Sequence, residues 1–177
     1  MPGGGELVAA VARLSCLPVA AHAQPTAALV AAWSSGPEVV QQHLHKMLLA
    51  RYQAYRTSGL AGIATYDRGG GRFSNLAADL RKVSEAAFHA VLLGYPIVTV
   101  PQVQENLFWL KSIIQGKPTY VLTHVMAAPD GAARAIARRH YYASTGYNGE
   151  QSVAGFLPVQ GGTVVVCLAH ATPTDRE

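Results

Sequence analysis

The feature that most constrains the fold is a change of hydrophobic period near Gln104. Before it, the stretch from Gly36 to about Ser58 has apolar residues three and four positions apart, which predicts an amphipathic helix. After it, apolar and polar residues alternate in short stretches separated by turn residues, as is typical of antiparallel strands. We therefore predict an α+β fold, with N-terminal helices packed on a C-terminal antiparallel β-meander of four to five strands.

The first long helix has clear signals at both ends. Pro37 suits the first helical position, and Gly59 suits the C-terminal stop. Its expected apolar stripe consists of Val40, Leu44, Met47, Leu48 and Tyr55. This stripe is expected to pack against the sheet.

Two further helices are expected in the same part of the chain. A short one covers 25–33, and a long one begins at Ser74 or Asn75 and ends near Leu93. The intervening "TYDRGGGRFSN" is a loop by composition, and it lacks the GK[ST] ending of a phosphate-binding loop.

The remainder of the chain predicts the sheet. The strand candidates are 106–114, 119–127, 134–144, 152–159 and 163–171. We expect one domain over 1–177, with a mainly helical part at 1–103 and a sheet part at 104–172.

Composition excludes several classes of protein. Half of the 177 residues are hydrophobic and 14% are charged, which argues against disorder. The net charge of +4 forms no basic stripe, so no nucleic-acid partner is expected. No apolar run is long enough for a transmembrane helix. Cys16 and Cys167 make no disulfide framework, and Cys167 is expected to be a buried thiol.

The N-terminus allows two interpretations. Ala21-His22-Ala23 fits the small-x-small rule for signal-peptide cleavage, but "MPGGGE" carries no positive charge and Arg13 interrupts the apolar run. We expect residues 1–23 to form a short helix and a loop, with a signal peptide as the alternative.

Strand alternation groups the polar residues by face. The predicted groups are Tyr120, Leu122, His124 and Met126 on the second strand, Ile136, Arg138, His140, Tyr142 and Ser144 on the third, and Val164, Val166, Leu168 and His170 on the last. Three histidines on neighbouring strands can hold zinc. Because no HxH pair or nearby carboxylate supports such a site, we expect no metal and no cofactor, and keep His124, His140 and His170 as an alternative.

Adjacent Arg138 and Arg139 must point to opposite faces of their strand. One is expected to reach solvent. The other is expected to be buried beside a carboxylate or the anionic group of a ligand, because an unpaired buried arginine is costly.

These patterns predict a pocket for a small apolar or amphipathic molecule. Its orienting polar residues would be Tyr120, His124, Arg138, His140 and Tyr142, and its apolar walls Phe108, Trp109, Leu122, Met126, Phe156 and Val166. Two alternatives stay open: an enzyme that uses the same histidines through a metal or as acid–base groups, and a protein–protein interaction domain. We favour binding over catalysis and leave the oligomeric state open.

Three stretches resemble a group of bacterial proteins of unknown function, many of them predicted to be exported. They are "MLLARYQAYRTSGLAGIATYDR", "FWLKSIIQGKPTYVLTHVMAAPDG" and "ARRHYYASTGYNGEQSVAGFLPVQGGTVVV". The similarity spans Ala31 to Asp175. It implies that the chain is a shortened member or a fragment, and that the protein is periplasmic or exported, with the cytoplasm as the alternative.

The same resemblance implies that other polar residues stand at the positions of His140 and His170, which weakens the metal interpretation. The outline of a meander covered by helices is also similar to START-like helix-grip domains. In that fold a curved sheet wraps a long helix around an apolar ligand cavity.

Overall fold

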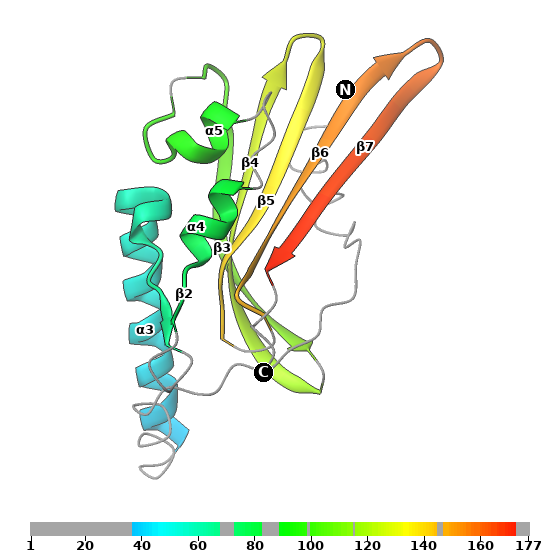
Figure 1. Ribbon diagram of the computed structural model, residues 1–177. Coiled ribbons are helices and arrows are strands. Elements are labelled where there is room, and N and C mark those ends of the chain that lie inside the picture. Colours follow the sequence, from blue (N-terminus) through cyan, green and yellow to red (C-terminus); the bar gives the residue numbers. More distant parts are fainter. Residues whose placement is uncertain are drawn as a thin grey trace.

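The structure is a computed structural model that describes residues 37–67, 73–82, 89–98, 100–114, 116–144 and 147–172. Within these residues, three helices and one 3₁₀ turn precede the main sheet: α3 (Pro37–Ser58), η1 (Gly59–Gly62), α4 (Leu76–Lys82) and α5 (His89–Gly94). In Figure 1 they lie together on one side of the sheet. The helix predicted over 25–33 and the N-terminal segment 1–23 lie outside the described residues.

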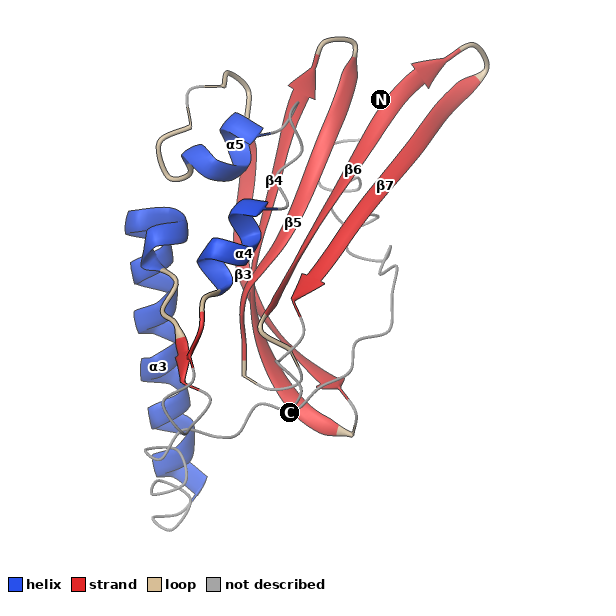
Figure 2. Cartoon of the chain, viewed as in Figure 1, coloured by secondary structure: helices blue, strands red, loops and turns tan. Residues whose placement is uncertain are grey.

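The main sheet is a five-stranded antiparallel meander. Its strands are β3 (Gln104–Ile114), β4 (Lys117–Asp130), β5 (Ala133–Ala143), β6 (Gly149–Val159) and β7 (Gly162–Thr172), hydrogen-bonded in the order β3-β4-β5-β6-β7. Figure 2 shows the tight turns that join β4 to β5 and β6 to β7. The α+β fold with an antiparallel meander is confirmed, and its five strands follow the five predicted stretches.

The helix α3 begins at Pro37 and is followed by Gly59, as predicted. Gly59 has a φ of +55°, and a Cβ atom there would overlap the carbonyl oxygen of Tyr95. Both the left-handed conformation and this close approach require glycine. The chain can therefore turn from α3 into η1 directly against the segment that follows α5.

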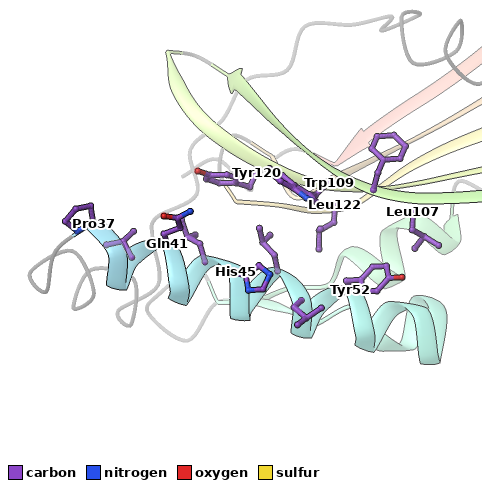
Figure 3. A pocket seen from close by; sticks show the side chains of 13 residues that line it. Pro37, Gln41, His45, Tyr52, Leu107, Trp109, Tyr120 and Leu122 are labelled. Atoms are coloured by element: carbon purple, nitrogen blue, oxygen red, sulfur yellow. The ribbon is translucent and has the colours of Figure 1, made fainter.

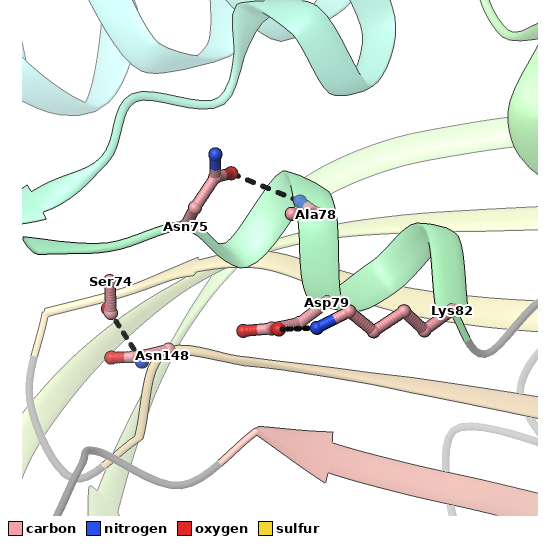
Figure 4. A network of polar contacts seen from close by, with 6 residues as sticks. All are labelled: Ser74, Asn75, Ala78, Asp79, Lys82 and Asn148. Carbon is pink, nitrogen blue, oxygen red and sulfur yellow. Dashed lines mark hydrogen bonds and ion pairs between the residues drawn. The ribbon is translucent and has the colours of Figure 1, made fainter.

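Asn75 caps α4, as expected. Its side-chain Oδ1 accepts a hydrogen bond of 3.0 Å from the backbone N–H of Ala78 (Figure 4). One residue earlier, Ser74 accepts a 2.9 Å hydrogen bond from Asn148, which joins the start of α4 to the sheet. Within the predicted helix from Ser74 or Asn75 to Leu93, the structure has α4 and α5, and 83–88 lie outside the described part.

The prediction that residues 65–75 form a loop is wrong at both ends of this stretch. Tyr66–Asp67 (β1) and Phe73–Ser74 (β2) pair as a small antiparallel ribbon. Tyr66 gives this ribbon a firm attachment to the main sheet, because its hydroxyl donates to the carbonyl of Asn148 at 2.7 Å and accepts from the backbone N–H of Ala143 at 3.2 Å. The ribbon is held by these contacts of Tyr66 with residues far away in the sequence. Local composition does not indicate such contacts.

The pairing of β4 with β5 contains a β-bulge. Leu122 pairs with Tyr142 and Thr123 pairs with His140, so Tyr141 is the extra residue. Tyr141 and Tyr142 consequently belong to the same buried cluster on the side of the helices. The prediction that Tyr142 shares a face with Arg138 and His140 is therefore wrong, because strict alternation stops at the bulge.

The hairpin of β6 and β7 is less covered than the rest of the sheet. Val164, Val165 and Val166 are between 46% and 56% exposed, and Cys167 is exposed and free. The expectation of a buried Cys167 is wrong because β7 is an edge strand and the described helices lie over the other strands (Figure 1). None of the described helices is long and apolar enough to cross a membrane.

Candidate functional site

A groove of about 650 Å³ lies between α3 and the strands β3 and β4 (Figure 3). Its lining residues are Pro37, Val40, Gln41, Leu44, His45, Leu48, Leu49 and Tyr52 of α3, Leu107, Phe108 and Trp109 of β3, and Tyr120 and Leu122 of β4. Figure 3 shows side chains of the helix and of the sheet facing each other across this space.

The apolar stripe of α3 explains the groove. At its C-terminal end the stripe enters the core, where Tyr55 is fully buried. Val40, Leu44 and Leu48 continue the same stripe toward the N-terminus but stay half-buried. From Pro37 to Tyr52 the lining covers about four helical turns. The helix thus carries more apolar surface than the described core covers.

Polar side chains lie among these apolar walls. Gln41 and His45 line the groove from the exposed side of α3, and the Tyr52 hydroxyl accepts a 3.0 Å hydrogen bond from Arg56. On the sheet, the rings of Trp109 and Tyr120 lie 6.3 Å apart between centroids, and Trp109 is 61% exposed. The groove is therefore open to solvent along an edge that can form hydrogen bonds.

The groove contains some of the predicted site residues and not others. Of the predicted polar contacts only Tyr120 lines it, together with the predicted walls Phe108, Trp109 and Leu122. The predicted residues that do not line it are His124, Met126, Arg138, His140, Tyr142, Phe156 and Val166. Met126, for instance, is fully buried in a core cluster with Val91 and Leu92.

Sequence reasoning missed the polar residues that the helix contributes to the groove. Gln41 and His45 stand four residues apart, and Tyr52 follows His45 after seven, beside the recognised stripe. Including the residue that follows each stripe position would have indicated Gln41 after Val40 and His45 after Leu44.

A chain of hydrogen bonds runs behind the groove, from the surface into the core. Arg139 Nη1 donates to the Tyr55 hydroxyl at 3.1 Å, and this hydroxyl lies 2.9 Å from His124 Nδ1. His124 Nε2 lies 3.2 Å from the carboxylate of Glu105, which is 48% exposed. A neutral His124 that carries its proton on Nε2 satisfies every link, since Tyr55 then donates to Nδ1 and His124 donates to Glu105.

Electrostatics agrees with a neutral imidazole. Burial lowers the pKa of His124 to about 3, and the positive charge of Arg139 acts in the same direction. The Glu105 carboxylate favours the charged form, but it is half exposed and screened by water, so burial outweighs it. At neutral pH the imidazole of His124 is therefore uncharged, and its Nδ1 accepts the hydrogen bond from Tyr55.

Both arginines are buried, so the expectation that one reaches solvent is wrong. Arg139 is fully buried and donates to three neutral oxygens, on Gln151 at 2.8 Å, on Tyr55 at 3.1 Å and on the backbone of Leu92 at 2.7 Å. In the described part of the chain no carboxylate lies within ion-pair distance of Arg139. The three hydrogen bonds join β5, β6, α3 and α5.

Arg138 has the carboxylate partner that the sequence predicts. It is 7% exposed and donates to Glu150 at 2.9 Å, on the sheet face opposite Arg139. On the same face a 2.7 Å hydrogen bond joins the Tyr147 hydroxyl and His140 Nδ1. Burial, followed by the charge of Arg138, lowers the pKa of His140 to about 3.

The three candidate metal histidines do not form one site. His124 contacts Tyr55 of α3, whereas His140 pairs with Thr123 and therefore lies on the opposite face. His170 pairs with Gln151 in the ladder. Among the described residues no group of three or more histidine, cysteine, aspartate or glutamate side chains could hold a metal ion.

Comparisons with known proteins add no relative: no family model, no curated protein and no solved structure matches this chain.

Proposed function

We propose that this protein binds a small apolar or amphipathic molecule in the groove between α3 and the strands β3 and β4. The observation that carries the proposal is the groove itself, with its volume of about 650 Å³ and its mainly aliphatic and aromatic lining. Small-molecule sites commonly enclose roughly 300–1,000 Å³ and combine apolar walls with a few polar groups.

The position of the polar groups supports an amphipathic ligand over a purely apolar one. Gln41, His45 and Trp109 lie at the exposed side of the groove, whereas Leu48, Leu107 and Leu122 are more buried. A bound chain or ring would remove apolar surface from water on the inner side and keep its polar end near solvent. The similarity in outline to START-like domains supports the proposal by analogy alone.

The enzyme alternative has less support. It relied on His124 and His140, and both are buried outside the groove with depressed pKa values. The interaction-domain alternative depends on the oligomeric state, since a stable homodimer or a co-purified partner would favour it.

Titration with the fluorescent amphiphile 1-anilinonaphthalene-8-sulfonate tests the proposal. Leu44→Trp should fill the groove and abolish saturable fluorescence enhancement. Val39→Trp is the matched control, since Val39 is on the same helix, is 43% exposed and does not line the groove. Enhancement that is equal in both variants and in the wild type would contradict binding in this groove.

A further inference from the structure

Lys111 is an exposed cation beside the groove. It stands two positions after Trp109 on β3, so the two side chains lie on the same face of the strand. In the ladder Lys111 pairs with Tyr120 of β4, and its Nζ lies 5.9 Å from the centroid of the Tyr120 ring. Because Trp109 and Tyr120 both line the groove, Lys111 extends the same surface by one position.

The lysine and the two rings form one cluster on the sheet. The ring centroids of Trp109 and Tyr120 are 6.3 Å apart. A distance of 5.9 Å from ammonium to ring is near the outer limit of a cation–π contact, so the ring binds the ammonium group only weakly. In the described part of the chain no carboxylate lies within ion-pair distance of Lys111. Its N–H donors can therefore bind an anion.

The groove has a buried apolar end and an exposed polar end. At the inner end, Leu107 packs with Leu48 against the buried cluster around Tyr55. Lys111 follows Leu107 by four residues on the same face of β3, which places it about 13 Å farther along the strand. Figure 3 likewise shows Leu107 and Tyr120 toward different ends of the groove. A molecule that lies along the groove can thus bury its apolar part near Leu107 and keep its polar end near Lys111.

The charges around the groove favour an anionic ligand group over a cationic one. None of the described residues that line the groove is acidic. Glu38 is the only acidic residue of α3, and it does not line the groove. Glu105 stands six residues before Lys111, about 20 Å along β3, where its carboxylate contacts His124. A cationic group beside Lys111 would therefore be repelled without a nearby carboxylate to offset the repulsion.

We propose that the groove binds a single-chain amphiphile with an anionic head group, such as a carboxylate or a sulfate, and that Lys111 pairs with this head group beside Tyr120. The inference rests on the proposed function and deepens it, because it names the polar end of the ligand and the direction in which the ligand lies. The apolar chain then runs from Trp109 toward Leu107, between the sheet and the stripe of α3.

Displacement of the uncharged fluorescent probe N-phenyl-1-naphthylamine at pH 7.5 and low salt tests the proposal. The competitors are octanoate and 1-octanol, which have chains of equal length and differ in the charge of the head group. The measured quantity is the ratio of octanoate affinity to octanol affinity. We expect Lys111→Gln to lower this ratio about two- to five-fold through weaker octanoate binding. Added salt should lower the ratio in the wild type, because it screens the charge of Lys111.

Two further variants separate the role of Lys111 from that of net charge. Lys46→Gln is the matched control, because it removes the same charge from an exposed position of α3 that does not line the groove. Lys111→Arg keeps the charge and should keep the wild-type ratio. A ratio that is unchanged in Lys111→Gln, or lowered equally in Lys46→Gln, would overturn the role of Lys111 and leave the groove proposal intact. If neither competitor displaces the probe from the wild type, both proposals fail.

Discussion

The hydroxyl of Tyr55 on α3 lies 2.9 Å from Nδ1 of His124 on β4, and both side chains are fully buried. Through this contact the helix is held to the sheet by polar groups as well as by apolar packing. Tyr55 also accepts from Arg139, so one hydroxyl serves two buried partners. Its position at the end of the groove makes it a structural support for the groove.

Replacing Tyr55 by Phe should destabilise the protein. The substitution leaves Nη1 of Arg139 and Nδ1 of His124 without a partner, which we expect to lower the free energy of unfolding by about 2–4 kcal/mol. Urea denaturation measures the change. Tyr52→Phe is the control, because among the described residues its hydroxyl bonds only to the exposed Arg56, and its loss should cost less than about 1 kcal/mol. Equal losses in the two variants would contradict the account.

Stability should fall in mild acid. The pKa values of His124 and His140 are depressed to about 3 in the folded state, so protonation near pH 6.5 occurs first in the unfolded chain. Their contribution is fully present above pH 6.5 and is lost as the pH falls toward 3. Each histidine lowers the unfolding free energy by at most about 1.4 kcal/mol per pH unit in that window.

Different charged and polar groups face the two histidines. Glu105, Tyr55 and Arg139 face His124, and Glu150, Arg138 and Tyr147 face His140. Urea midpoints at pH 7.5 and pH 5 should therefore differ less in His124→Gln than in the wild type. An unchanged pH dependence in this variant would show that His124 does not titrate as described.

Gly59→Ala should be more damaging than Gly116→Ala. Both glycines have positive φ, +55° and +74° respectively, so each alanine carries a conformational cost of about 1 kcal/mol. Only at Gly59 would the added methyl group also meet backbone, at the carbonyl of Tyr95, whereas at Gly116 the space is open. Thermal melts should show the larger drop for Gly59→Ala, and a reversed order would count against this close approach.

The sequence predicts the fold well because its signals are local. Pro37, Gly59 and Asn75 mark helix ends by their backbone and capping chemistry, and alternation with turn residues marks the five strands. The site is predicted less well because its geometry is not local. The bulge at Tyr141 ends the alternation, and the β1–β2 ribbon depends on contacts of Tyr66 with distant residues.

The histidines show a further limit of sequence reasoning. A neutral histidine in a core and a histidine in a binding site can occupy the same positions in the alternating pattern of a strand, so the sequence does not distinguish them. Only the contacts of His124 with Tyr55 and Glu105, and of His140 with Tyr147, distinguish them. Trp109 and Tyr120, by contrast, line the groove between α3 and the sheet, and their role in binding a ligand stays a prediction.

Native mass spectrometry of the full chain, compared with its denatured mass, tests the central claim most directly. We predict a non-covalent adduct of a few hundred daltons on the purified wild type, or after incubation with 1-octanol an adduct of one alcohol molecule. The adduct should persist in Val39→Trp and disappear in Leu44→Trp. A wild type that stays bare under both conditions, or an adduct that survives Leu44→Trp, would contradict ligand binding in the groove between α3 and the sheet.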